Sequence, residues 1–557
     1  MARRISEALN RDKEGELAGK GIGNARDLFL HTHLVDEVGM NFFRFPRIIA
    51  PPIASCEGEF AIFDLPEVRM NSIPEIGQTV LNFIGGKWQP SESDRWSDRH
   101  DPADHSVLVA RAPDSSATDA QHAIAAAADA AETWNAINAP KRGRILFEWL
   151  NWMDANKDQI ANLLTREEGK ILSESAGELK RSIDILEYTA GMGRRLEGRV
   201  FPAEEDGVFC YSSSQPLGVV GLISPWNFPV AIPVWKLSPA LIAGNTAVLK
   251  PSPLTPLTAT ALVRGLEEAG LPPGVVNLVH GDSAPGAELV SNENVKGVSF
   301  TGSTKVGKMI AREGGERMLK LQLELGGKNP QIVLDDADLD QAVNGVIAGG
   351  FGSTGQRCTA TSRAIVTEKV YDDFLSRLIM RASKIRVGPG VESGVEMGPL
   401  VDSRAMNGVA HYVGVGVNEG GKLVAGGAAV KDGGLDRGYF FAPTVIEAQQ
   451  GMEITREEVF GPLVAVIRVR DVEEGIKVAN SVRYGLTSTI FTRDVSKVFR
   501  FAERAQAGII HVNRPGVGGF SHAPFGGIKD SGYGGREVGD EVMSFYTETK
   551  VVYVNYK

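Results

Sequence analysis

Three features are scarce in this sequence: cysteine, an excess of positive charge, and long hydrophobic runs without proline. The three cysteines in 557 residues, Cys56, Cys210 and Cys358, are too few for a disulfide framework, so we expect a reducing, cytoplasmic location. The net charge of −10 argues against a surface for nucleic acid or for an anionic membrane. We therefore expect neither as a partner, and we predict no metal site.

The longest apolar stretch runs from Gly221 to Leu249. It is interrupted by four prolines, at positions 225, 229, 233 and 239, and by Lys236. So many helix breakers favour a buried, irregular pocket wall over a membrane-spanning helix. The chain does not start with a charged segment followed by an apolar one, so no signal peptide is predicted.

The sequence is rich in alternating strand-length and helix-length patterns. A chain of 557 residues is too long for one core and should form two or three domains. From residue 219 onward, helical segments such as Thr255–Ala269 alternate with apolar runs of strand length, which are Val219–Ile223, Thr246–Leu249, Val275–Val279 and Val298–Thr301. Residues 319–325 alternate strictly like a strand, and a second βα series begins at Pro330. We predict an α/β protein with two doubly wound parallel-sheet domains that meet near Glu324.

Residues outside these two series have patterns of their own. Residues 117–134 and 144–166 show helical periodicity. Residues 545–554 are rich in β-formers and predict an edge strand, which indicates oligomerisation.

Cys358 is a candidate nucleophile. A lone cysteine is more often a buried structural residue than a reactive one. Cys358, however, follows the polar, glycine-containing run Thr354-Gly355-Gln356-Arg357, which is unusual for a core position. A thiol reacts as the thiolate, so its surroundings would have to favour ionisation.

Glu324 and Asn227 could assist such a nucleophile. Glu324 lies between two leucines, and partial burial would raise its pKa into the range of a general base; the alternative is a solvent-facing strand residue. Asn227 lies between Trp226 and Phe228 and could donate to an oxyanion, although it could also stabilise a turn between two prolines. Nucleophile, base and oxyanion donor together indicate covalent chemistry on a carbonyl.

A small-residue segment, Phe300 to Gly307, ends one predicted strand and opens a helix, where backbone N–H groups can face a phosphate. Its spacing is GxxxxG, so a structural turn is also compatible with it. Lys250 ends another strand, at the edge where open parallel sheets bind ligands; a solvated turn lysine is the alternative.

From about residue 80 onward the chain resembles the aldehyde dehydrogenase superfamily. Six motifs occur in that superfamily's order: Ser224–Pro229, Phe300–Ser303, Leu323–Lys328, Gly355–Cys358, Glu457–Pro462 and Pro524–Gly527. The resemblance implies that Cys358 attacks an aldehyde, that Asn227 and the Cys358 backbone N–H hold the oxyanion, and that Glu324 activates water to hydrolyse a thioester. It also implies a set of cofactor-binding residues: Ser224, Pro225, Trp226, Lys250, Ser252, Gly302, Ser303, Gly307, Leu325, Glu458 and Phe460.

The resemblance implies a domain organisation as well. Residues 76–196 and 218–324 would bind NAD or NADP, 325–539 would form the catalytic domain, and 197–217 with 540–557 would form a small β segment that builds a homodimer or homotetramer. Residues 1–75 have no counterpart in the family, and Met70 begins an ordinary domain start. We expect this extension to be loosely ordered or dispensable; a targeting or docking arm is the alternative.

One position bears on the reaction type and another on the choice of cofactor. Relatives that transfer the acyl group to coenzyme A typically lack the glutamate found here at position 324, so release of a free acid is favoured. Many NAD-preferring relatives have a glutamate where this chain has Pro253, so the resemblance leaves NAD and NADP both open.

The substrate is inferred from the run Cys358 to Arg363, which resembles that of enzymes oxidising 2-oxoglutarate semialdehyde. By resemblance Arg194, Arg195 and Arg514 border the substrate tunnel, where a guanidinium could hold a carboxylate. We expect a short semialdehyde of the 2-oxoglutarate or succinate type. The alternatives are neutral aliphatic or aromatic aldehydes, coenzyme-A-dependent acylation, a thiol esterase, and a non-catalytic binding or structural protein on the same scaffold.

Overall fold

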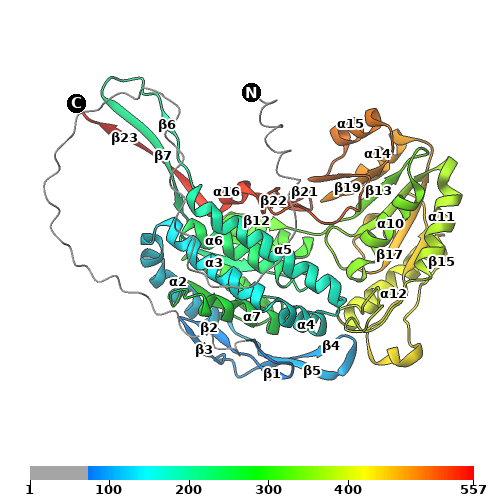
Figure 1. The fold of residues 1–557 in the computed structure, drawn as a ribbon, viewed down its shortest axis with the longest axis horizontal. Helices are drawn as coiled ribbons and strands as arrows, with labels where there is room; N and C mark the ends of the chain where they lie inside the picture. The colour runs from blue at the N-terminus through cyan, green and yellow to red at the C-terminus, as the bar shows by residue number, and fades with distance from the viewer. Residues whose placement is uncertain (1–72) are drawn as a thin grey trace, which may run out of the picture. The chain divides into compact units, whose positions relative to one another are not determined.

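Two large sheets organise the part of the chain that the computed structural model describes, residues 73–557 (Figure 1). The predictions made for residues 1–72, including Cys56 and a start at Met70, lie outside the described residues. The α/β class with two parallel-sheet domains is confirmed.

The first sheet has eight strands, and its five central strands are parallel. In spatial order the strands are β22 (Gly532–Gly534), β12 (Lys320–Glu324), β11 (Val295–Thr301), β8 (Val219–Ile223), β9 (Thr246–Lys250), β10 (Val276–Leu278), β2 (Asn82–Ile84) and β3 (Lys87–Gln89). Strand β22 comes from far along the chain and pairs antiparallel with β12. The base candidate Glu324 is therefore the last residue of a strand with neighbours on both sides.

Helices cover both faces of this sheet because alternate strand residues point to opposite faces. Val219 and Val248 pack with α2 (Ala117–Ala136) and α8 (Ser283–Ser291). Val220 and Leu249 pack on the other side against a second group of helices. That group comprises α3 (Ala139–Ala155), α4 (Lys157–Glu168), α5 (Leu172–Gly191), α6 (Ala231–Ala243) and α7 (Pro256–Glu268).

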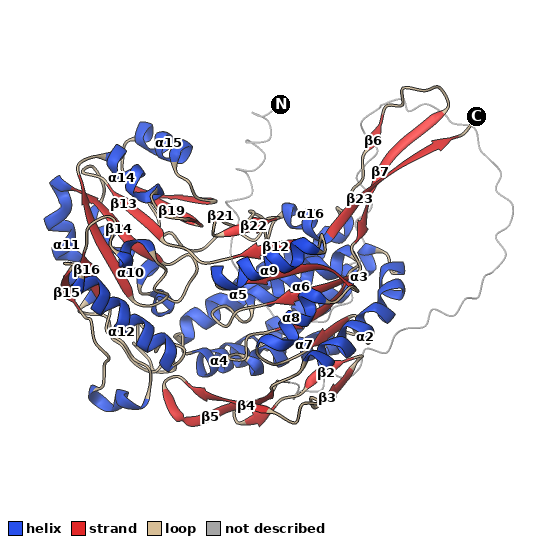
Figure 2. Ribbon diagram, turned by 180° about the vertical axis from the view of Figure 1, so that it is seen from behind, coloured by secondary structure: helices blue, strands red, loops and turns tan. Residues whose placement is uncertain are grey.

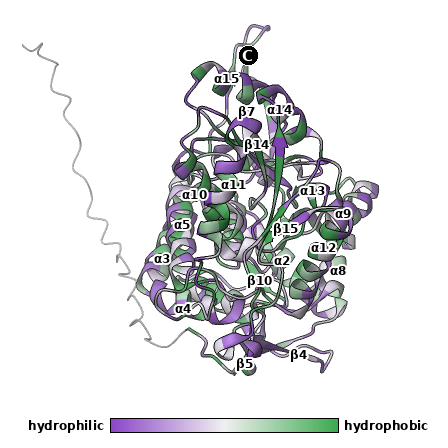
Figure 3. Ribbon diagram, turned by 90° about the vertical axis from the view of Figure 1, so that its right-hand side faces the viewer, coloured by the Kyte–Doolittle hydropathy of each residue, from purple (hydrophilic) through white to green (hydrophobic). Residues whose placement is uncertain are grey.

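The second sheet has seven strands, all parallel except β15 at one edge. In spatial order they are β15 (Lys422–Ala425), β16 (Thr444–Glu447), β17 (Leu463–Val469), β14 (Thr361–Thr367), β13 (Asn329–Val333), β19 (Thr487–Phe491) and β20 (Ile509–Val512). Its main helices are α10 (Leu339–Gly350), α11 (Glu368–Ala382), α12 (Ser403–Asn418), α14 (Val472–Asn480) and α15 (Val495–Arg504). The outer helices α11 and α15, like α9 (Thr304–Glu316) beside the first sheet, carry both hydrophilic and hydrophobic residues (Figure 3).

A narrow three-stranded sheet projects from the first domain (Figures 1 and 2). The tail strand β23 (Thr547–Asn555) pairs antiparallel with β7 (Val208–Pro216) along its whole length, and β6 (Val200–Phe201) lies on the other side of β7. The edge strand expected near the C-terminus is therefore present, and its partner within the chain is β7.

The smaller elements connect these layers. They are β1 (Gln78–Thr79), β4 (Trp96–Asp101) and β5 (Asp104–Pro113) in one sheet, β18 (Tyr484–Gly485) and β21 (Ile528–Lys529) in another, α13 (Glu453–Arg456), α16 (Met543–Tyr546), and the 3-10 turns η1 (Met192–Arg194), η2 (Gly352–Gly355), η3 (Asp432–Arg437) and η4 (Asp540–Val542).

Two segments differ from the sequence-based expectation. The helical pattern of residues 144–166 is divided between α3 and α4, because Asn156 has a non-helical conformation between them. The irregular wall expected within Gly221–Leu249 is wrong over residues 231–243, which form the regular, entirely buried helix α6 with Pro239 inside it. Among residues 73–557 no helix is long and apolar enough to cross a membrane.

Candidate active site

A strained loop carries Cys358 between α10 and β14. Ser353, Thr354 and Gly355 have φ values of 48°, 56° and 69°, three successive residues in the left-handed region. A side chain at Gly355 would lie 2.2 Å from the carbonyl oxygen of Gly461, so only glycine fits there. Cys358 follows this turn and is partly accessible to solvent.

Asn329, which the sequence analysis did not single out, fixes the backbone on the other side of the thiol. Its Nδ2 donates to the carbonyl oxygens of Cys358, at 2.8 Å, and Ala360, at 2.9 Å. Its Oδ1 accepts from the backbone N–H of Thr487 at 3.0 Å. The asparagine begins β13, so the second sheet itself holds the nucleophile loop.

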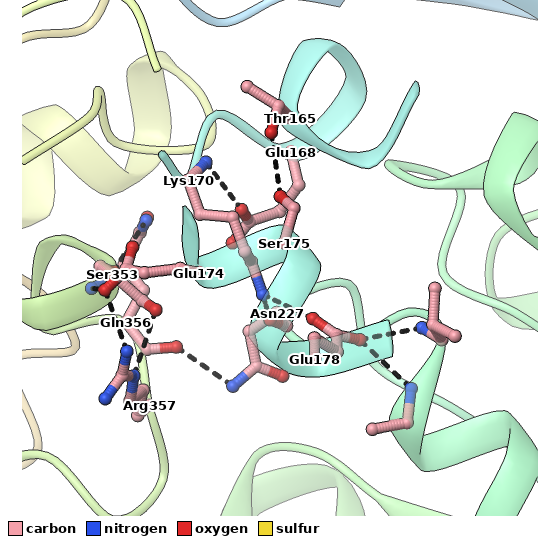
Figure 4. A network of polar contacts seen from close by, with 12 residues as sticks. Thr165, Glu168, Lys170, Glu174, Ser175, Glu178, Asn227, Ser353, Gln356 and Arg357 are labelled. Carbon is pink, nitrogen blue, oxygen red and sulfur yellow. Dashed lines mark hydrogen bonds and ion pairs between the residues drawn. The ribbon is translucent and has the colours of Figure 1, made fainter. Parts of the chain in front are cut away.

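Asn227 lies beside this loop on the segment that follows β8. Its side chain is buried, and Nδ2 donates to the carbonyl oxygen of Gln356 at 2.9 Å, two residues before the cysteine (Figure 4). An amide nitrogen carries two hydrogens, so this contact orients the group and leaves a second N–H to donate.

Glu324 ends β12 and is also buried. Its Oε2 accepts from the backbone N–H of Gly527 at 3.1 Å, and a side chain at Gly526 would lie 2.4 Å from Oε1. Burial, and then the neighbouring carboxylate of Glu537, raise the pKa of Glu324 well above its ordinary value. The burial of Glu324 agrees with the partly buried base expected from the sequence and not with the alternative of a solvent-facing strand residue.

The electrostatics of the thiol oppose its ionisation. Burial, followed by the negative charges of Glu458, Glu324 and Glu537, raises the pKa of Cys358 to about 12. The sequence suggested surroundings that favour the thiolate, whereas the surrounding carboxylates favour the neutral thiol. Attack on a carbonyl therefore requires that the proton be removed as the reaction proceeds.

The expected cofactor residues lie at the carboxyl ends of strands in the first sheet. Lys250 ends β9, its carbonyl accepts from the Ser224 N–H at 3.1 Å, and burial lowers its pKa to about 8. Ser303 caps α9, and Gly307 on that helix leaves no room for a side chain beside Leu325. This edge is where open α/β sheets bind ligands.

Other members of the expected set join the two domains. Glu458 accepts from the Gly327 N–H at 2.9 Å, and the rings of Trp226 and Phe460 meet edge to face with centroids 5.5 Å apart. The expected cofactor-binding residues thus include contacts between the segment after β12 and the segment before β17, and Glu458 among them is close enough to Cys358 to affect the pKa of the thiol.

The structure suits a polar ligand at this edge. The hydroxyls of Ser224 and Thr301, at the ends of β8 and β11, are buried without a hydrogen-bond partner. A cavity of about 530 Å³ is lined in part by Ser252, Pro253 and His280, which follow strands β9 and β10 of the same sheet. Unpaired donors and space at strand ends fit a dinucleotide.

Comparison with known proteins identifies the scaffold. A model of the aldehyde dehydrogenase family matches residues 88–552. The chain belongs to this family. It is accordingly an oxidoreductase, an NAD(P)-dependent aldehyde dehydrogenase.

Several relatives are similar over nearly their whole length. The dehydrogenase is 44% identical to an alpha-ketoglutarate semialdehyde dehydrogenase of Haloferax volcanii (85% of this chain, 99% of the relative) and 41% identical to an alpha-ketoglutaric semialdehyde dehydrogenase of Bacillus subtilis (86% and 98%). It is 38% identical to an NADP(+) succinate-semialdehyde dehydrogenase of Escherichia coli (84% and 96%).

Solved structures agree with the fold. An aldehyde dehydrogenase of Burkholderia cenocepacia is 38% identical with a TM-score of 0.84, covering 86% of this chain and 98% of its own. A betaine aldehyde dehydrogenase of Staphylococcus aureus in complex with NAD+ is 34% identical, also with a TM-score of 0.84, covering 86% and 95%.

The arginines expected at the substrate tunnel lie at exposed positions. Arg194 and Arg195 follow α5, and Arg195 donates to the Tyr188 carbonyl at 3.3 Å. Arg514 follows β20. Within residues 73–557 no hydrogen bond or ion pair joins these three arginines to Cys358, Glu324 or Asn227.

Arg181, which the sequence analysis missed, is closer to the chemistry of this dehydrogenase. It lies on α5, its Nη1 donates to the Gly519 carbonyl at 2.5 Å, and its guanidinium carbon is 6.0 Å from the Trp235 ring centroid. Burial lowers its pKa, and the charge of a Cys358 thiolate acts on it in the opposite direction. No motif marks Arg181 in the sequence, because a helical arginine followed by Ser-Ile-Asp is typical of an ordinary amphipathic helix.

Proposed function

We propose that this aldehyde dehydrogenase oxidises a short semialdehyde bearing a carboxylate, of the 2-oxoglutarate or succinate semialdehyde type, to the free acid. The proposal is supported by the guanidinium of Arg181, which is near enough to Cys358 that a negative charge on the thiol would raise the Arg181 pKa. A guanidinium near the thiol could bind the carboxylate at one end of a short substrate while the thiol attacks the aldehyde at the other end. The names of the most similar relatives support the same substrate class.

The Arg181 guanidinium has few competing partners. Within residues 73–557 its side chain makes one hydrogen bond, which goes to the backbone carbonyl of Gly519. It therefore retains donors for a carboxylate, which binds arginine best through two parallel hydrogen bonds. The ring of Trp235 lies beside it, and the ring of Phe525 lies against Trp235 with the centroids 5.5 Å apart. These rings would pack against the carbon chain of the substrate.

The proposed reaction begins at Cys358. The thiol gives its proton to solvent water and its sulfur bonds to the aldehyde carbon. The C=O π electrons move to the carbonyl oxygen, which becomes an oxyanion that accepts from Asn227 Nδ2 and the Cys358 N–H. A bound nicotinamide would accept the hydride that leaves this carbon, so that a thioester remains on Cys358. The resulting thioester carbon is then attacked by water, whose proton passes to the Glu324 carboxylate, and the acid leaves as the thiol is restored.

The residues at the strand ends would hold that cofactor. Lys250, at the end of β9, and Glu458 would bond ribose hydroxyls, and Gly302 and Ser303, just before α9, would face a pyrophosphate. NAD and NADP both remain compatible, because Pro253 provides neither a carboxylate to repel a 2′-phosphate nor a cation to bind it.

The test is a comparison of substrates with and without a carboxylate, at saturating NAD and then NADP. We expect kcat/KM to be highest for a semialdehyde acid, and we expect Arg181→Gln to lower it about 10- to 100-fold for that substrate only. A matched control is Arg195→Gln, which changes an exposed arginine after the same helix. If a neutral aliphatic or aromatic aldehyde has the higher kcat/KM in the parent enzyme, the substrate proposal is wrong.

A further inference from the structure

A buried ion pair lies directly behind Asn227 (Figure 4). Lys170 Nζ is 2.7 Å from Glu178 Oε2, and the two side chains are 1% and 0% exposed. The same ammonium donates to the backbone carbonyl of Asn227 at 2.6 Å and lies 4.2 Å from the ring centroid of Phe228. Lys170 thus contacts the oxyanion-donor segment at two successive residues.

Glu178 holds the far end of that segment. Its Oε1 accepts from the backbone N–H groups of Val230, at 2.9 Å, and Ala231, at 3.0 Å (Figure 4). These groups begin α6 and lack acceptors within the helix. One lysine and one glutamate therefore bind both ends of a five-residue segment whose first residue is Asn227.

The ammonium stays charged in this environment. Burial favours the neutral amine, but the carboxylates of Glu168 and Glu178 outweigh it and raise the pKa of Lys170. A buried ion pair seldom adds net stability compared with apolar residues of similar size. The Lys170–Glu178 pair contacts the segment that carries Asn227, which suggests that the pair serves to hold that segment.

Asn227 is consequently held from both sides. Its backbone carbonyl accepts from Lys170, and its side chain donates to the Gln356 carbonyl. We propose that Lys170 and Glu178 are positioning residues that aim the Asn227 amide at the oxyanion formed on Cys358. This inference rests on the proposed role of Asn227, because Lys170 and Glu178 would act only through that residue.

The test is a double-mutant cycle in the full-length enzyme, with Lys170→Met, Asn227→Ala and the combination. The readouts are the single-turnover rate of nicotinamide reduction and the cofactor-free hydrolysis of 4-nitrophenyl acetate, which also forms an oxyanion at the cysteine. We expect Lys170→Met to lower both rates about 10- to 100-fold with Asn227 present, since small displacements of a catalytic group are costly. With Asn227→Ala in place we expect the same change to cost less than about threefold.

Glu178→Gln is the second variant, because it keeps the size of the side chain and one acceptor oxygen for Val230 and Ala231 while it removes the charge and the acceptor that hold Lys170. It should show the same non-additivity with a smaller loss, and it carries the test alone if Lys170→Met does not fold. The matched control is Arg166→Met, which breaks an ion pair with Asp101 made from the neighbouring helix α4; it should leave both rates within about twofold and be additive with Asn227→Ala.

Two results have distinct meanings. Equal losses from Lys170→Met with and without Asn227 would overturn the positioning role while leaving the reaction scheme intact. No loss from Asn227→Ala itself would instead refute the proposed oxyanion role on which the inference rests.

Discussion

In the proposed mechanism, the protons of Cys358 and Glu324 decide the rate of this dehydrogenase. Both react as conjugate bases, and both have a raised pKa, the thiol to about 12. Near neutral pH the Cys358 thiol is therefore mostly protonated in the free enzyme. A thiol that is neutral at rest is protected from oxidation and from stray electrophiles, since the thiolate is the reactive form.

The pH dependence follows from these shifts. Because the active forms are deprotonated and the pKa values are raised, the active fraction grows as pH rises. We expect kcat/KM at saturating cofactor to increase steadily from about pH 6 to about pH 9. A profile that is flat or falls across this range, measured with a substrate whose own charge does not change, would contradict the pKa shifts.

Replacement of the base should separate the two halves of the reaction. Glu324→Gln keeps the side-chain shape but cannot take a proton from water. We expect the steady-state rate to fall about 100- to 10,000-fold while the first turnover still forms the acylated Cys358, visible as a mass increase of the intact protein. Cys358→Ala is the control and should show neither turnover nor acylation.

At the scale of elements, the left-handed turn at Ser353 to Gly355 precedes Cys358 and packs against Gly461. Gly355→Ala would place a methyl group 2.2 Å from the Gly461 carbonyl at a φ of 69°. We expect the free energy of unfolding to fall by more than about 1 kcal/mol and activity to fall with it. The readouts are the apparent melting temperature and kcat.

Gly177→Ala provides the control for that change. Gly177 lies inside α5, and nothing lies within 4 Å of the position an added Cβ would take. An alanine there should be neutral or stabilise the helix by up to about 1 kcal/mol. Equal losses of stability in both variants would contradict the steric explanation.

The sequence predicted the strands and the ordered motifs, because both are local patterns. Apolar runs between glycines indicated β8 and β9, and the order of the motifs indicated Cys358, Glu324 and Asn227. Contacts between distant segments could not be predicted in this way. Arg181 lies on α5 and Lys170 lies in the short link between α4 and α5, neither with distinguishing neighbours in the sequence. Their importance appears only once α5 packs beside α6 and Lys170 reaches the Asn227 carbonyl. The buried helix α6 was missed because its prolines resemble breaks, whereas Pro233 occupies the first turn, where no N–H is needed.

At the scale of the whole chain, the projecting sheet has an unusual surface. Within residues 73–557 its exposed apolar side chains are Val200, Phe201, Phe209, Val551, Tyr553, Val554 and Tyr556. Such a group on three adjacent strands is typical of a protein interface. We propose that it forms the expected homodimer or homotetramer.

The double substitution of Val551→Asp and Tyr553→Asp should disrupt that assembly. Two carboxylates would be buried without partners at the interface, at a cost of several kcal/mol. We expect light scattering to show a monomer for the double variant and a dimer or tetramer for the parent enzyme. Val495→Asp, an exposed apolar residue on α15, is the control and should leave the assembly unchanged.

The pocket of Glu324 has a consequence for the synthesis of the chain. The N–H that binds its carboxylate belongs to Gly527, 203 residues later, and the neighbouring strand β22 follows directly after. Because a chain folds from its N-terminus as it is made, the ribosome releases the nucleophile and the oxyanion donor long before the base has its lining. A nascent or truncated chain would therefore carry a thiol that can be acylated and a base that is not yet set to remove the acyl group.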